Sequence, residues 1–242
     1  MPADIDRRQF IEIASLTAAS LTIPAGLVAG TASAQTAPEP GKPAMSYEIK
    51  PLPFDPSRIK GMSEKILTSH YENNYVGAVK RLNAIDAELA SLDWAKAPNF
   101  VINGLKREEL IAANSMILHE QFFDGIGGDG QPGGMIEEAI KRDFGSVDRW
   151  RAEFTAMGKA EGGGSGWVIL SYLPRDKRLV NCWAADHTTT LAGGRPVLVL
   201  DMYEHAYHMD YGAKAAAYVD AFMQNIRWDS AASLYTRYSG EK

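Results

Sequence analysis

A carboxylate and a histidine lie four residues apart at the end of an apolar run. The run Val197–Leu200 is typical of a buried β-strand, and Asp201 follows it directly, with His205 four positions later. Two side chains placed where a strand passes into a loop can both reach one metal ion. A pair with this spacing is also common as a capping aspartate beside a structural histidine. The spacing alone therefore leaves both interpretations open.

The other histidines favour a metal site. His70 and His119 each lie among apolar residues of a helical pattern, where either one alone would fit an ordinary core histidine. With Asp201 and His205 they form a set of three imidazoles and one carboxylate, which suits iron, manganese or zinc. Cys182 is the only cysteine, so a disulfide within the chain and a cysteine-based metal site are both excluded.

The composition is that of a folded globular protein. The 242 residues are 45% hydrophobic and 23% charged, and the formal net charge is -5. The negative charge argues against nucleic acid as the main partner, because proteins that bind it usually carry a basic face. After the N-terminal segment, no stretch is long and apolar enough to predict stable membrane association.

The first 34 residues have the features of an export signal. Arg7-Arg8 precedes an apolar, alanine-rich stretch that ends in small residues, and the arrangement resembles a twin-arginine signal. A membrane anchor is the alternative, but Glu12 and Pro24 interrupt the stretch. We expect export to the periplasm, cleavage of the signal peptide (1–34) after Ala34, and a flexible proline-rich N-terminus at residues 35–45.

Long helical patterns come before the strand patterns. The spacing of apolar residues predicts a helix capped by Ser63 that continues through Leu82, and a second helix over about 107–123 with Leu110 and Ile117 facing inward. A glycine-rich loop at 125–134 separates these helices from the C-terminal half of the chain. Shorter helices, three strands and two final helices are expected at about 135–144, 147–159, 166–173, 178–183, 197–201, 213–225 and 229–238.

These elements predict an α+β fold. A long helical hairpin at residues 46–128 comes first, and an α/β domain with a small three-stranded antiparallel sheet comes second, at residues 129–242. The boundary is placed in the glycine-rich loop, because composition changes most sharply there.

Several segments together resemble one known family, the iron/manganese superoxide dismutases, from about Ser46 to Tyr238. The segments are Tyr47–Phe54, His70 with Leu82-Asn83, His119 with Phe122-Phe123, Phe144-Gly145-Ser146, Gly164–Trp167 and Asp201–Tyr207. The last of these matches the most specific signature of the family. The combination is specific, although no single segment is.

The resemblance implies a superoxide dismutase, which disproportionates superoxide to oxygen and hydrogen peroxide. It implies one iron or manganese ion per subunit, held by His70, His119, Asp201, His205 and one solvent molecule. The choice between iron and manganese stays open, because both metals use these ligands. Two alternatives remain: a non-catalytic dimeric protein with the same fold, and another metal-centred oxidoreductase such as a peroxidase-like enzyme.

The resemblance also assigns residues around the ligands. His187 lies where the family has a glutamine or histidine that bonds the metal-bound solvent, and we expect it to take that role; an ordinary loop histidine is the alternative. Trp167 and Tyr203 are expected to line the metal pocket. Glu204 matches a residue that reaches across a homodimer interface to a ligand histidine of the other subunit.

Three positions depart from the family pattern. Ala78 stands where a gateway tyrosine is usual, so proton delivery and turnover are expected to be slower. Asn74 and His208 replace a histidine–tyrosine pair that crosses the dimer interface, and a hydrogen bond between them could substitute for it. We therefore expect a homodimer formed through Glu204, His208 and Asn74, with a tetramer left open.

Overall fold

The computed structural model describes residues 45–162 and 164–241. The predicted signal peptide and residues 35–44 of the predicted flexible N-terminus lie outside the described residues. In chain order the elements are η1 (Pro56–Arg58), α1 (Glu64–Ser69), η2 (His70–Tyr75), α2 (Val76–Ser91), α3 (Asn99–Asp124), α4 (Gly134–Phe144), α5 (Val147–Glu161), β1 (Trp167–Leu173), β2 (Arg178–Ala184), β3 (Arg195–Asp201), η3 (Glu204–Ala206), α6 (His208–Tyr211), α7 (Ala215–Gln224) and α8 (Trp228–Ser239).

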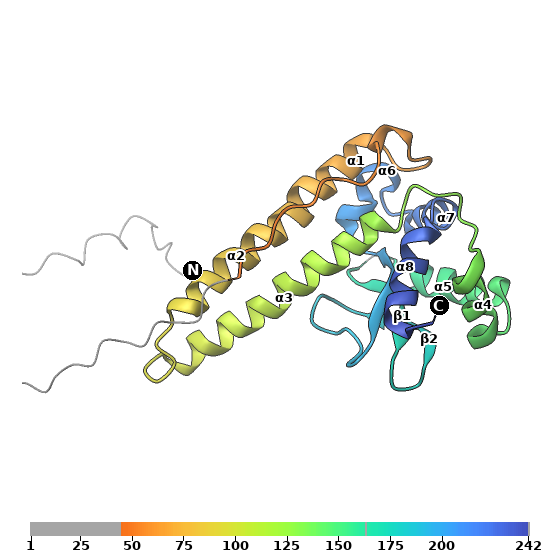
Figure 1. Cartoon of the computed structure of the whole chain (residues 1–242). Helices are drawn as coiled ribbons and strands as arrows, with labels where there is room; N and C mark the ends of the chain where they lie inside the picture. Colours follow the sequence, from red (N-terminus) through yellow and green to blue (C-terminus); the bar gives the residue numbers. More distant parts are fainter. Residues whose placement is uncertain (1–44, 163, 242) are drawn as a thin grey trace, which may run out of the picture. The chain divides into compact units, whose positions relative to one another are not determined.

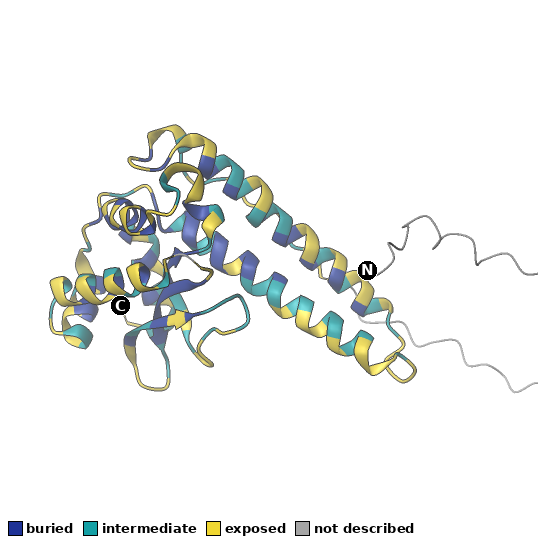
Figure 2. Cartoon of the chain, turned by 180° about the vertical axis from the view of Figure 1, so that it is seen from behind, coloured by how far each residue is buried: buried dark blue, intermediate teal, exposed yellow. Residues whose placement is uncertain are grey.

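Helices α2 and α3 form the predicted antiparallel hairpin (Figure 1). Val79 and Leu82 of α2 are buried, as are Ala112 and Met116 of α3, and exposed residues gather at the end of the hairpin farthest from the sheet (Figure 2). Apolar residues three or four positions apart lie on one face of a helix, so each helix buries one stripe. The hairpin therefore provides a rigid support for residues near its other end.

The first predicted helix is interrupted by one wider turn. Ser63 caps α1 as expected, since its hydroxyl accepts a hydrogen bond from the Ile66 amide at 3.2 Å. The residues from His70 to Tyr75 then form a π-helical turn before α2 continues. Such turns are rare and occur often at functional sites. The expectation of one regular helix is wrong at this turn.

Helix α3 is longer than the sequence pattern predicted. It begins at Asn99, directly after Pro98, whereas the prediction began near residue 107. Leu110 and Ile117 are 46% and 41% exposed, so the expectation that they face inward is wrong. Proline disfavours a helical conformation for the residue before it, and a helix can start immediately after it.

An extended N-terminal segment runs beside the helices (Figure 1). The side chain of Asn83 holds it as a neighbouring strand would: its Oδ1 accepts from the Tyr47 amide at 2.7 Å, and its Nδ2 donates to the Tyr47 carbonyl at 2.9 Å. Farther along, the Tyr71 hydroxyl donates to the Lys50 carbonyl at 2.7 Å. Side chains of α2 and of the π-helical turn thus fix this segment.

The sheet has three antiparallel strands in the order β2-β1-β3. Trp167 at the start of β1 pairs with Ala184 at the end of β2 and with Asp201 at the end of β3. Helices α4, α5 and α8 contact the sheet, and α3 packs against β3. The predicted α+β fold, with long helices followed by a three-stranded antiparallel sheet, is confirmed.

The predicted boundary between residues 128 and 129 lies in the loop between α3 and α4. One hydrophobic cluster includes buried residues from both sides of this loop, such as Leu82 and Met116 on one side and Leu198 and Phe222 on the other. Among the described residues, no helix combines the length and the apolar character that a membrane crossing requires.

Candidate metal centre

Four elements bring the predicted ligands together. His70 begins the π-helical turn, and His119 lies in the second-last turn of α3. Asp201 is the last residue of β3, and His205 lies in the short helix η3 that comes after it. The Tyr218 hydroxyl donates to the Asp201 carbonyl at 2.8 Å and fixes the end of the strand. The four side chains therefore come from well-ordered secondary structure.

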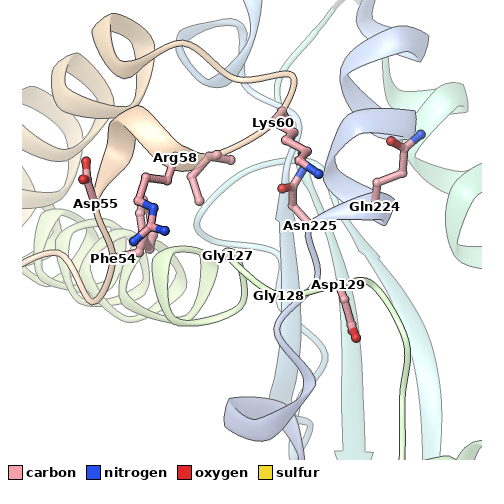
Figure 3. A pocket seen from close by; sticks show the side chains of 10 residues that line it. Phe54, Asp55, Arg58, Lys60, Gly127, Gly128, Asp129, Gln224 and Asn225 are labelled. Carbon is pink, nitrogen blue, oxygen red and sulfur yellow. The ribbon is translucent and has the colours of Figure 1, made fainter.

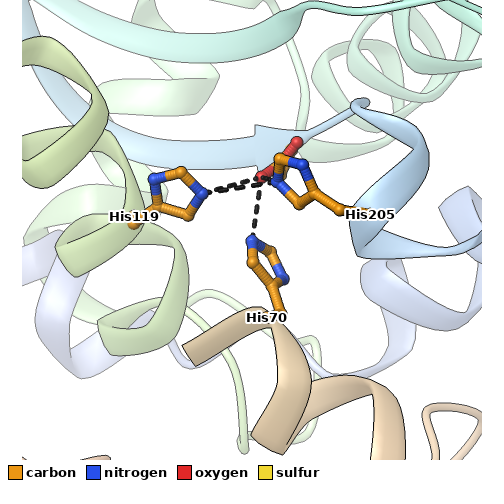
Figure 4. Close-up of side chains that lie close together, drawn as sticks. His70, His119 and His205 are labelled. Atoms are coloured by element: carbon orange, nitrogen blue, oxygen red, sulfur yellow. Dashed lines mark hydrogen bonds and ion pairs between the residues drawn. The ribbon is translucent and has the colours of Figure 1, made fainter. Parts of the chain in front are cut away.

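The ligand atoms of His70, His119, Asp201 and His205 all lie within 4.8 Å of one another (Figure 4). The Nε2 atoms of His70 and His205 are each 3.0 Å from Asp201 Oδ2, and His119 Nε2 is 3.5 Å from it. Ligands at about 2.0–2.2 Å from one ion are separated by roughly 3 to 4 Å, depending on the angle between them. The observed spacing therefore suits one metal ion.

The protonation of His119 supports the same conclusion. Its Nδ1 is 2.6 Å from the Ser115 carbonyl, which can only accept, so Nδ1 carries the proton. Burial lowers the pKa of His119 to about 3, so the ring is neutral near pH 7 and its Nε2 offers a lone pair. That lone pair faces the Asp201 carboxylate and the Nε2 of His205, 3.4 Å away. A cation bound between this lone pair and the carboxylate would satisfy both groups.

The surroundings of His70 also favour a bound cation. Its Nε2 is fully buried, and although Asp201 Oδ2 lies 3.0 Å away, no described residue meets it with hydrogen-bond geometry. The ring is fixed by Phe122 and Phe123, whose centroids each lie 5.0 Å from its own. A buried polar atom without a partner is costly, and a bound ion would satisfy it. The donor set therefore fits a resident metal ion.

Asp201 supplies the negative charge. Burial alone would raise the pKa of its carboxyl, but the neighbouring histidines, His205 foremost, hold this pKa well below its usual range. Its Oδ1 accepts from the Tyr203 amide at 2.8 Å, which orients Oδ2 toward the histidines. When the three imidazoles coordinate an ion as neutral ligands, the single carboxylate leaves a divalent or trivalent ion with net positive charge, suited to an anionic substrate.

The site is open on one side only. The side chains of His70, His119 and Asp201 are at most 1% exposed, whereas that of His205 is 25% exposed. A small molecule would thus approach from the side of His205.

The structure brings the three predicted pocket residues beside the ligands. The Trp167 ring meets His119 edge-on at 5.1 Å, and its Nε1–H donates to His187 Nδ1 at 3.2 Å. The Tyr203 ring stacks between His187 and His205, at 4.9 Å and 5.3 Å. These contacts place the three residues around the ligands, and their roles in catalysis stay a prediction.

Burial and hydrogen bonding define the state of these groups. Burial lowers the pKa of His187 and raises that of Tyr203 to about 12. His187 is therefore neutral near pH 7, and since its Nδ1 accepts from Trp167, its Nε2 carries the proton. Tyr203 keeps its hydroxyl proton at any physiological pH. Both side chains are neutral groups that can donate a hydrogen bond.

Two residues of the site were missed in the sequence. Ser115 is buried, and its carbonyl oxygen orients His119 through the bond described above. Asn114 donates from Nδ2 to the carbonyl of His187, far away in the sequence. A position four residues before a helical histidine could have indicated Ser115, because the two lie one turn apart. No sequence signal connects Asn114 with His187.

The tyrosines nearest the missing gateway position serve another purpose. Ala78 is buried in α2. The Tyr75 hydroxyl donates to Glu120 at 3.1 Å and accepts from the Lys50 amide at 2.9 Å. Together with the bond from Tyr71 to the Lys50 carbonyl, these contacts engage both tyrosines with the N-terminal segment.

A cavity lies away from the metal ligands. It has a volume of about 640 Å³ and is bounded by Arg58 and Lys60 near α1 and by Gly127, Gly128 and Asn225 (Figure 3). None of the four ligand residues lines it. This cavity is therefore separate from the four ligand side chains.

Fold and site together define a mononuclear metalloenzyme of the three-histidine, one-aspartate type. Residues 132–234 match the family model for the C-terminal domain of iron/manganese superoxide dismutases. The chain is 70% identical to a superoxide dismutase [Fe] of Cupriavidus metallidurans over 191 residues, which are 79% of this chain and 97% of that protein.

More distant relatives are also named as superoxide dismutases. A superoxide dismutase [Mn] 2 of Haloferax volcanii is 35% identical over 197 residues, 79% of this chain and 96% of that protein. A superoxide dismutase [Fe] of Aquifex pyrophilus is 35% identical over 182 residues, 72% and 84% respectively. The chain belongs to the iron/manganese superoxide dismutase family. The predicted enzyme class is confirmed, as is one iron or manganese ion at the four-residue site.

Proposed function

We propose that this chain disproportionates superoxide with iron as its resident metal. The observation that carries the reaction is the convergence of three imidazole nitrogens on one buried carboxylate oxygen, with access beside His205. A redox-active ion bound here supplies one-electron chemistry, by which two superoxide anions and two protons become one dioxygen and one hydrogen peroxide. Iron is favoured over manganese because the relative at 70% identity is named as an iron enzyme.

The residues around the ligands would control protons and water. His187, with its proton on Nε2, is proposed to donate to solvent bound at the open coordination position. Trp167 holds this tautomer through its bond to Nδ1. Tyr203 stacks on His205 and lines that side of the metal pocket. Hydrogen bonds of this kind commonly tune the potential and the acidity of a metal site.

Proton delivery is proposed to be slower than in relatives that have a gateway tyrosine. Ala78 has no group that could donate, and the hydroxyls of Tyr71 and Tyr75 are engaged with the N-terminal segment. The reaction consumes two protons per cycle, so a weak proton supply would limit turnover at high superoxide concentration.

A homodimer is proposed through residues that lie next to the opening of the site. Glu204 and His208 are exposed next to the ligand His205, and Asn74 is half-buried on the turn that begins with His70. A dimer formed there would let Glu204 of each subunit reach toward His205 of the other. The mass of the protein in solution by light scattering tests this. A monomer at micromolar concentration would contradict it, whereas Glu204→Ala is expected to weaken the dimer and the retention of metal.

We further propose export to the periplasm by the twin-arginine route. The support is the sequence pattern of residues 1–34, with its arginine pair and small residues at the end. That route carries folded proteins, so the metal could be acquired before export. Fractionation of cells, with Arg7→Lys and Arg8→Lys together as the blocked control, tests it. Mature protein retained equally in the cytoplasm by both forms would refute the proposal.

The central experiment measures bound metal and superoxide decay on the same purified protein. We expect about one iron ion per subunit, with activity lost on removal of the metal and restored by iron. His119→Ala should lose both metal and activity, whereas Ile117→Ala, an exposed position on the same helix, should keep both. Metal-loaded protein without activity would refute the reaction. Full activity of the His119→Ala variant would refute the site.

A further inference from the structure

The loop that carries His187 is fastened to helix α3 by the side chain of Asn114. This residue donates its Nδ2–H to the backbone carbonyl of His187, across 73 positions of sequence. Leu118, one helical turn after Asn114, packs in the small cluster that contains Trp167. Residues four apart lie on one helix face, so Asn114 faces the same side of the molecule as this cluster.

The ring of His187 is held on three sides. Trp167 donates to Nδ1 at 3.2 Å, Tyr203 stacks on one face at 4.9 Å, and the ring of His119 lies 6.1 Å away. These contacts fix the tautomer and the tilt of the ring. They do not fix the backbone from which it projects, because stacked rings can slide over one another.

The loop also has a local fold of its own. Asp186 Oδ1 accepts from the amide and the hydroxyl of Thr188, each at 2.7 Å, which forms a tight turn around His187. That turn keeps its shape wherever the loop lies. A contact outside the loop is needed to set its distance from the ligands, and Asn114 provides one from the helix that carries His119.

We propose that Asn114 is a positioning residue that holds His187 at its working distance from the metal ligands. The inference rests on the proposed role of His187 as the donor to metal-bound solvent. Ligand and donor then share one rigid support: His119 projects from α3 directly, and His187 is tied to α3 through Asn114. A shift of the helix moves both together, which preserves their spacing.

The test compares Asn114→Ala and Asn114→Asp with Asn103→Ala, a matched control at an exposed asparagine on the same helix. Aspartate keeps the shape of the side chain but cannot donate when ionised. In metal-loaded protein, both Asn114 variants should raise hydrogen exchange in the 185–190 segment by about tenfold, as expected for loss of one hydrogen bond. Asn103→Ala should leave it unchanged.

Measurements of turnover distinguish an effect of Asn114 on the position of His187 from an effect on the stability of the loop alone. Asn114→Ala should lower the turnover number by about five- to tenfold in the otherwise unchanged chain. It should add nothing in a His187→Ala background, because its effect passes through His187. Metal content should stay the same in every variant.

The outcomes are distinguishable. Full activity of His187→Ala would refute the proposed role of His187, and this inference with it. A damaged His187→Ala enzyme beside an unaffected Asn114→Ala enzyme would refute the inference alone. Equal losses from Asn114→Ala with and without His187 would also refute it, since Asn114 would then act by another path.

Discussion

Gly158 in helix α5 lies against Leu200, near the end of β3. A Cβ atom added at this position would lie 2.8 Å from Leu200 Cδ2, and 3.2 Å and 3.3 Å from the two γ-methyl carbons of Val219. Leu200 and Val219 are fully buried, so neither can move into solvent. Leu200 directly precedes the ligand Asp201. Gly158→Ala should therefore strain the core and disturb the ligand at once.

The magnitude follows from two opposing effects. Alanine is favoured over glycine within a helix by about 1 kcal/mol. Forcing an extra methyl into a packed core costs about 1–3 kcal/mol. Gly104 in α3 has no atom within 4 Å of an added Cβ, so Gly104→Ala gains the first effect alone. The variants should differ by about 1–3 kcal/mol, or roughly 3–10 °C in melting temperature for a chain of this size.

Calorimetry of the two variants, with and without metal, measures the difference, and bound iron is quantified on the same samples. Gly158→Ala should melt below Gly104→Ala in both states and bind less iron. If both variants melted at the same temperature, Gly158 would not lie against Leu200 and Val219 as described. If only the metal-loaded forms differed, the strain would act through Asp201 and not through the core.

Three further perturbations have defined outcomes. Trp167→Phe keeps a ring against His119 but removes the hydrogen-bond donor to His187, so turnover should fall about tenfold with metal content unchanged. An unchanged turnover would show that this hydrogen bond does not contribute to catalysis. Burial raises the pKa of Glu161 from 4.5 to about 8, so the native carboxyl keeps a proton that the unfolded chain releases. The free energy of unfolding should therefore fall as the pH rises from 4.5 to about 8. Glu161→Gln should weaken this pH dependence in denaturation measurements, and equal pH slopes for the two proteins would contradict the prediction. Removal of the metal should lower the melting temperature, because an ion at a thousand times its dissociation constant stabilises the native state by about 4 kcal/mol. A melting temperature that a chelator does not change would argue against an ion site in the native state.

Much of the fold could be predicted because its elements are strongly patterned. The capping Ser63 and the apolar run before Asp201 both lie where the sequence indicated. The order of helices and strands follows from local spacing alone. These features depend on neighbours in the sequence, which a single chain displays directly.

The errors arise where distant residues decide. The π-helical turn at His70 has no marker in local spacing, since the same residues would fit a regular helix. Leu110 and Ile117 match an apolar stripe but lie on the exposed side of α3, because the face toward α2 and the sheet is made by others such as Ala112 and Met116. Periodicity identifies a helix better than it identifies which face is buried.

The candidate site shows the same division. The ligands were recognised from their types and from whole-chain resemblance, and the contact of Trp167 with His187 agrees with the expected pocket. The supports of these residues were not recognised. Ser115 and Asn114 act through a backbone carbonyl and a loop carbonyl, and carbonyl groups carry no residue-specific signal in a sequence.

The ligands are widely spaced along the chain. His70 and His119 are 49 positions apart, and 82 positions separate His119 from Asp201. Before folding, only Asp201 and His205 are close enough in the sequence to bind one ion together. Tight binding therefore begins when the α2–α3 hairpin packs against the sheet. Afterwards three of the four ligands are inaccessible, and exchange of the ion requires that packed elements separate. The metal in a purified sample therefore records which ions were abundant while the chain folded, and not only which ion the site prefers at equilibrium.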